Sequence, residues 1–64
     1  MSEKMKLVRK NAKLTQSLLA SKIGVTRQTI GLIEKGEYNP SLKLCIAIAK
    51  TLNTTLDDLF WEDD

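Results

Sequence analysis

Apolar residues recur every three or four positions along most of the chain, which is the spacing that puts them on one face of an α-helix. Five segments follow this pattern, and we expect helices over 3–12, 16–23, 27–35, 42–52 and 56–60. The residues expected to face inward are Met5, Val8, Ala12, Leu19, Ala20, Ile23, Ile30, Ile33, Cys45, Ile48, Ala49 and Leu52. No alternation of period two runs through the chain, so the pattern predicts an all-α protein.

Residues that favour helix ends mark the boundaries of these segments. A serine or threonine stands before four of them, where its hydroxyl accepts a hydrogen bond from a free backbone N–H. These residues are Thr15, Thr26, Ser41 and Thr55. Gly24 and Gly36 follow two segments and suit the left-handed conformation after a helix. Thr55 and Asp58 resemble a capping box, and Asp57 and Asp58 lie at the positive end of the last helix, which explains both aspartates without a catalytic carboxylate pair.

Charge is unevenly distributed along the chain, although the net charge is only +2. Residues 1–56 carry ten positive and three negative side chains, a balance of +7, whereas residues 57–64 carry five acidic side chains, a balance of −5. A basic body favours a polyanionic partner such as DNA or RNA, and the acidic end is expected to lie away from that partner. The alternative is a solvated surface with an acidic end that aids solubility.

Length and composition exclude several classes of function. A chain of 64 residues makes one small domain with a marginal core. The longest apolar stretch, 45–49, is far shorter than the ~20 residues of a membrane span, and no signal peptide opens the chain, so we expect a cytoplasmic protein. Cys45 is the only cysteine and histidine is absent. Without histidine, a glycine-rich phosphate loop or clustered metal ligands, we expect no enzyme activity, no cofactor and no metal site.

The segment 14–36, with the sequence LTQSLLASKIGVTRQTIGLIEKG, is the most informative for function. Its two short helices are joined by the tight turn 24–26, which sets the second helix across the first. With Ile30 and Ile33 inward, the second helix has four outward positions, which are Arg27, Gln28, Gly31 and Lys35. The side chains of Arg and Gln match the hydrogen-bonding edges of guanine and adenine in the major groove. The pattern therefore predicts a helix that reads DNA.

Several segments, in their order and spacing, resemble the Xre-type helix-turn-helix family, which includes the phage Cro proteins and the lambdoid phage repressors. They are LTQ at 14–16, LA at 19–20, IGVTRQTI at 23–30, IEKG at 33–36, NPSL at 39–42 and LDDLF at 56–60. The chain also resembles very small stand-alone bacterial regulators of the cytolysin-operon repressor type. This resemblance implies that residues 1–64 form a single five-helix, lambda-repressor-like domain that regulates transcription, with a short strand at 60–62 as an optional addition.

The resemblance also implies roles for individual residues. Those expected to read bases are Arg27, Gln28, Gly31 and Leu32, and those expected to contact the DNA backbone are Gln16, Thr26, Thr29, Lys35, Tyr38 and Asn39. Arg9 and Glu34 match an ion pair of the family that joins the first helix to the recognition helix. Lys13 stands where the family often has glycine, which predicts a small backbone strain, and Leu18 stands where the family often has glutamate.

One recognition helix reads only a few base pairs, so a regulator of this type is expected to bind a near-palindromic operator as a homodimer and to block transcription sterically. The residues expected in the dimer interface are Leu56, Leu59, Phe60 and Trp61, with Met5 or Leu7 as further contributors. In the alternative arrangement, Trp61 packs on its own domain. No small-molecule ligand is evident.

Two other functions remain as alternatives. A helix-turn-helix that binds a protein, as an antitoxin or an adaptor, is the main one, and it has no need of Arg27, Gln28 or the basic body. RNA binding lacks an aromatic stacking platform, because Tyr38 is isolated.

Overall fold

The computed structural model describes residues 3–60, which form five helices and no strand. The helices are α1 (Glu3–Asn11), α2 (Gln16–Ile23), α3 (Arg27–Lys35), α4 (Leu42–Thr51) and α5 (Leu56–Phe60). The prediction of an all-α protein with five helices is confirmed, although α1 and α4 each end one residue earlier than expected. Phe60 ends α5, so it does not belong to a strand, and 61–62 lie outside the described residues.

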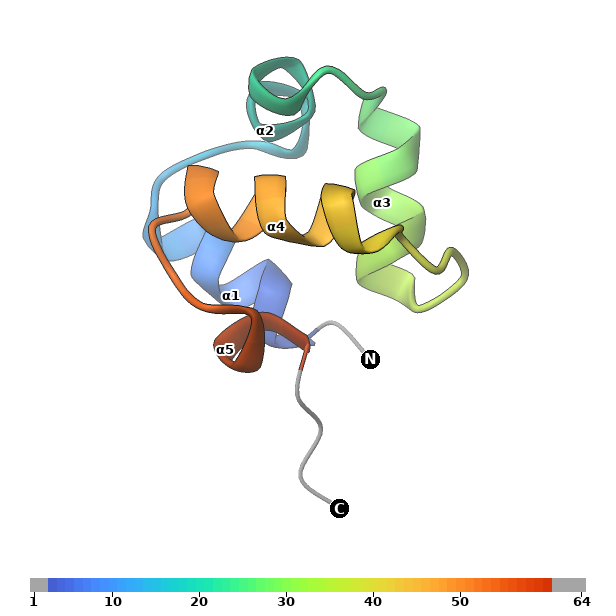
Figure 1. Ribbon diagram of the computed structural model, residues 1–64. Helices are drawn as coiled ribbons and strands as arrows, with labels where there is room; N and C mark the ends of the chain where they lie inside the picture. The colour runs from blue at the N-terminus through green and yellow to red at the C-terminus, as the bar shows by residue number, and fades with distance from the viewer. Residues whose placement is uncertain (1–2, 61–64) are drawn as a thin grey trace.

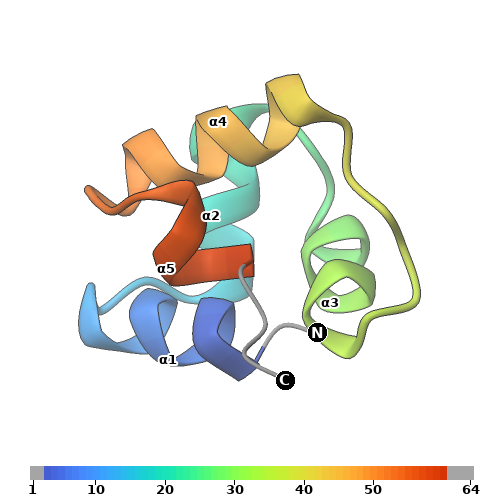
Figure 2. The ribbon, with the colours of Figure 1, turned by 60° about the horizontal axis from the view of Figure 1, so that its bottom comes forward.

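The helices enclose one small core. In Figure 1, α4 crosses the middle of the molecule, with α2 at one end of the view, α5 at the other and α3 to the side. In Figure 2, α5 lies between α1 and α4, while α3 stands on the far side and packs mainly against α2. This arrangement leaves one whole side of α3 away from the other helices. Among the described helices, none has the length and apolar content that crossing a membrane requires.

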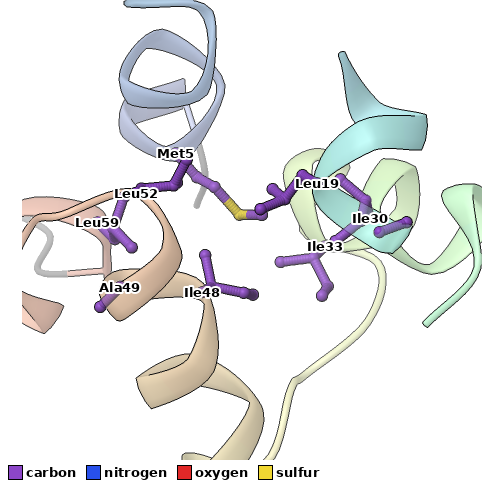
Figure 3. Close-up of a cluster of buried hydrophobic side chains, with 9 residues drawn as sticks. Met5, Leu19, Ile30, Ile33, Ile48, Ala49, Leu52 and Leu59 are labelled. Atoms are coloured by element: carbon purple, nitrogen blue, oxygen red, sulfur yellow. The ribbon is translucent and has the colours of Figure 1, made fainter. Parts of the chain in front are cut away.

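Every helix contributes to the core. Figure 3 shows that the Met5 side chain extends from the side of Leu52 and Leu59 toward Leu19, so it joins two halves of the cluster. Methionine suits this position because its unbranched chain fills irregular gaps between helices. The buried apolar residues are Met5, Leu19, Ala20, Ile30, Ile33, Ile48, Ala49, Leu52 and Leu59. Most of the residues expected to face inward belong to this cluster.

Four expected core positions differ from this. Val8, Ile23 and Cys45 are only half-buried at the edge of the core, and Ala12 is exposed. The prediction for Ala12 was wrong because α1 ends at Asn11 and the chain turns away before the next inward position. At Cys45, burial raises the pKa of the thiol and outweighs a backbone hydrogen bond that lowers it, so the group stays a neutral thiol.

The helix ends follow the predicted chemistry. The Thr15 and Thr26 hydroxyls accept hydrogen bonds from the backbone N–H groups of Leu18, at 3.0 Å, and Thr29, at 3.1 Å. Ser41 and Thr55 cap α4 and α5 in the same way. Gly24 and Gly36 adopt left-handed φ angles of 79° and 78° at the ends of α2 and α3. At α5, the Asp58 carboxylate also accepts a hydrogen bond from the Thr54 hydroxyl at 3.0 Å.

Two residues other than glycine have positive φ. Lys13, with φ 62°, makes the turn from α1 to α2, where the sequence predicted strain, and its N–H donates to the carbonyl of Lys10 at 2.9 Å. Asn53, with φ 56°, makes the turn after α4 and was not anticipated. Asn tolerates this conformation better than most residues, whereas a lysine gains nothing from it.

We predict that Lys13→Gly raises the unfolding free energy by roughly 0.5–1 kcal/mol. A left-handed conformation costs an L-residue about 1–2 kcal/mol, and the greater freedom of glycine in the unfolded chain offsets about 0.4–1 kcal/mol of the relief. Urea denaturation followed by circular dichroism measures the change. The matched control is Lys10→Gly, an exposed position inside α1, which should lose about 1 kcal/mol. Equal losses in both variants would show that Lys13 carries no strain.

Candidate nucleic-acid interface

The turn between α2 and α3 sets the direction of α3. Gly24 closes α2 in the left-handed conformation, and the Val25 N–H donates to the carbonyl of Ala20 at 3.0 Å. Val25 packs against the core, and Thr26 then caps α3. Ala20 is buried and small, which allows α2 and α3 to pack closely. The four residues thus fix how α3 leaves the bundle.

α3 divides its residues between two environments. Ile30 and Ile33 are fully buried, and they anchor one side of the helix in the core. On the other side Arg27, Gln28 and Lys35 are exposed, as the sequence predicted from helical spacing. Gly31, Leu32 and Thr29 are half-buried along the edges of this surface. The helix is held rigidly while its first turn presents an arginine and a glutamine to solvent.

The remaining residues expected to contact a DNA backbone lie at the two ends of α3. Thr26 is exposed, and its hydroxyl oxygen lies 3.0 Å from that of Thr29. Tyr38 and Asn39 are exposed in the turn that follows α3. Together with Lys35 they form a polar border around the outward side of the helix. Their roles toward DNA remain predictions.

A buried ion pair joins α1 to α3. The Arg9 Nε donates to Glu34 Oε2 at 2.7 Å, and Arg9 Nη2 donates to Glu34 Oε1 at 3.3 Å. The two side chains are only 7% and 5% exposed. Arg9 Nη1 also donates to the Leu14 carbonyl at 2.8 Å, in the turn before α2. The pair that the resemblance implied is therefore present, and it reaches the α1–α2 connection as well.

Gln16, at the start of α2, continues this network toward the outer surface. Its Nε2 donates to Glu34 Oε1 at 3.0 Å, and its Oε1 accepts a hydrogen bond from Arg27 Nη1 at 3.0 Å. The Gln16 side chain passes above Gly31, since a Cβ built there would lie 3.9 Å from Nε2 and 4.0 Å from Oε1. Sequence reasoning missed this link, because no local pattern reports a contact between side chains 11 or 18 residues apart.

The expected dimer interface is only partly available at the surface. Leu59 and Met5 are fully buried in the core of the same chain, so their side chains cannot contact a partner. The inclusion of Leu59 was wrong because its position on α5 faces α1 and α4. Leu56 and Phe60 are half-buried, and Trp61 lies outside the described residues. Any interface at this end is therefore built on Leu56, Phe60 and Trp61.

Apolar surface also occurs where the sequence gave little warning of it. Leu18 on α2 is 50% exposed, and Leu7 on α1 is 60% exposed. Leu42 and Ile46, one turn apart on α4, are 68% and 38% exposed. Helical spacing alone does not separate these residues from core positions, because each lies near the edge of an apolar stripe.

The fold and the exposed side of α3 define a helix-turn-helix protein, and comparison with known proteins agrees. The helix-turn-helix family matches residues 5–59. An uncharacterized HTH-type transcriptional regulator of Methanocaldococcus jannaschii is 52% identical over 65 residues, covering 100% of this chain and 98% of that protein. The uncharacterized HTH-type transcriptional regulator YgzD of Bacillus subtilis is 41% identical over 64 residues, covering 100% and 97%.

Two further similarities concern a phage protein and a solved structure. The immunity repressor protein of Bacillus phage phi105 is 36% identical over 61 residues, which are 95% of this chain and 42% of the repressor. The restriction-modification controller protein C.AhdI from Aeromonas hydrophila has a TM-score of 0.84 at 29% identity, covering 91% of this chain and 88% of that one. The chain belongs to the Xre-type helix-turn-helix family of DNA-binding transcription regulators. This family is a class of regulators and not a class of enzymes.

The buried ion pair allows a test by single and double substitution. We predict that Arg9→Met or Glu34→Leu alone lowers the unfolding free energy by roughly 3–5 kcal/mol, because each leaves one buried charge without its partner. The double variant removes both charges and should lose less than either single variant. Urea denaturation measures all three, with a stabilising osmolyte if a single variant is unfolded in buffer. Lys10→Met, at the exposed position next to Arg9, is the control. Losses that simply add would contradict the pairing.

Proposed function

We propose that the protein is a sequence-specific regulator that binds double-stranded DNA by placing α3 in the major groove. The observation that carries this proposal is the division of α3, with Ile30 and Ile33 fixed in the core and Arg27 and Gln28 exposed at its first turn. Helix-turn-helix proteins read bases with residues at the start of such a helix. The excess of positive charge over residues 1–56 favours the approach of α3 to a polyanion.

The chemistry of the exposed residues suggests how the work is divided. Arg27 suits a bidentate contact to guanine, and Gln28 suits a bidentate contact to adenine. Leu32, at the edge, suits a thymine methyl group, and half-buried Gly31 leaves room for close approach. Phosphate contacts are assigned to the polar residues around α3, helped by the free N–H groups at its start. These residues are Gln16, Thr26, Thr29, Lys35, Tyr38 and Asn39.

A single copy of α3 covers too few base pairs for a specific site, so the proposal includes a homodimer on a near-palindromic operator. Leu56 and Phe60, half-buried on α5, and Trp61 are the residues proposed for the dimer interface. Repression is the proposed outcome, with the dimer blocking a promoter sterically. The similarity to the immunity repressor of phage phi105 supports this choice.

Selection of bound duplexes from a random DNA library at physiological salt tests the proposal. We expect an inverted repeat whose half-sites lie about one helical turn apart, since two α3 helices related by a two-fold axis meet the same groove on one side of the duplex. A recovered motif without inverted symmetry would argue against the dimer. Recovery of no motif would reject specific DNA binding and would favour a protein-binding module, for which exposed Leu18 and Leu42 offer apolar contact surface.

Two variants of equal charge separate base reading from backbone contact. We predict that Arg27→Ala loses about 1–3 kcal/mol of discrimination at one base pair of each half-site. Lys35→Ala should weaken binding to all duplexes by a similar factor and reduce the slope of log affinity against log salt by about one per copy. The control is Lys50→Ala, at the end of α4 that lies away from α3. Fluorescence anisotropy across a salt series measures all three, and an unchanged preference in Arg27→Ala would refute the assignment of the reading surface.

A further inference from the structure

The hydrogen bonds around Glu34 reach from the interior to the exposed Arg27. The Glu34 carboxylate is held by Arg9 from α1 and by Gln16 from α2, and Gln16 in turn holds Arg27. Arg27 is the exposed end of this chain, and Arg9, which is buried, is the other end. A long side chain at the surface is normally mobile, so a fixed acceptor beside Arg27 calls for an explanation.

The order of charges in the network decides which way the Gln16 amide points. A carboxylate only accepts hydrogen bonds, so Glu34 binds the NH2 group of Gln16 and turns the amide oxygen outward. That oxygen is the acceptor that the Arg27 guanidinium needs. With the amide reversed, two donors would face each other. Glu34 is itself fixed in place by Arg9, at 2.7 Å.

We propose that Gln16 is a positioning residue, which together with the buried Arg9–Glu34 pair holds the Arg27 guanidinium in place before DNA binds. This inference rests on the proposed function, in which Arg27 reads a base, and it adds how that side chain is oriented. Only one Arg27 nitrogen, Nη1, donates to Gln16, so the other donors of the guanidinium stay available. A side chain that is already ordered loses less conformational entropy on binding.

Gly31 belongs to the same device. It lies on α3 one turn after Arg27, and the Gln16 amide passes over it at ordinary van der Waals distance from where a Cβ would be. A larger side chain at this position would occupy the path from Gln16 to Arg27. Gly31 thus contributes space for Gln16, in addition to the close approach to DNA proposed above.

The first test uses the free protein and needs no DNA. Arg9 and Arg27 are the only arginines in the chain, so nitrogen relaxation of the arginine Nε–H groups gives two signals. We expect an order parameter above about 0.6 for Arg27 in the unaltered protein and a value well below it in Gln16→Met and Gln16→Ala. The Arg9 signal should remain ordered in both variants and so reports that the fold persists. An Arg27 that is equally mobile with and without Gln16 overturns the proposal.

The second test measures sequence preference on the selected operator. In Gln16→Met we expect discrimination to fall about twofold to tenfold, the cost of immobilising one long side chain, and only at the base pair where Arg27→Ala loses its preference. Ser21→Ala, at an exposed position on the same helix, is the control and should change nothing. A uniform loss over all sequences would reduce Gln16 to a backbone contact and overturn the positioning role. If no specific operator exists, the proposed function fails, while the relaxation data still decide whether Gln16 orders Arg27.

Discussion

Two buried charges, on Arg9 and Glu34, can stay in the interior only while they remain together, and this constraint ties three helices to one arrangement. Each charge loses its hydration in the fold, so the geometry of the pair must compensate through short, directed hydrogen bonds. Packing of apolar side chains tolerates small shifts between helices, whereas hydrogen bonds of this kind do not. The pair joins α1 to α3, and its bonds to Leu14 and Gln16 include the start of α2.

A domain of this size has few apolar side chains with which to hold α3 steady. The core is one cluster drawn from all five helices, with Met5 spanning it. Local devices supplement it, since four hydroxyl caps and two left-handed glycines define where most helices begin or end. The result is a recognition helix that is rigid on its buried side and open on the other. A surface that reads DNA needs this rigidity, because bases are distinguished by hydrogen-bond geometry.

The network around Glu34 also connects stability with recognition. Its inner part, Arg9 and Glu34, contributes to the angle between α1 and α3, and its outer part, Gln16 and Arg27, reaches the exposed surface. A change in the interior is therefore felt at the first turn of α3 without any movement of the backbone. In a chain this short, the same few polar groups serve the fold and the candidate interface together.

The sequence by itself determined the five helices, their caps and the outward positions of α3. These features depend on contacts within one helical turn or one loop, and the spacing of apolar and polar residues encodes such contacts directly. Lys13 and its positive φ were likewise predictable, from the family resemblance and the usual preference for glycine. The Arg9–Glu34 pair also came from the resemblance, because residues 25 positions apart carry no local signal of contact.

Only the tertiary structure decided which apolar residues the chain keeps for itself. Leu59 looked available to a partner and is fully buried, whereas Ala12 looked internal and is exposed. The bond from Arg27 to Gln16 was equally hidden in the sequence, as both residues appeared to be independent surface groups. The physical reason is the same in each case. Burial and side-chain hydrogen bonding depend on how whole helices pack against each other, and the period of a single helix carries no record of its neighbours.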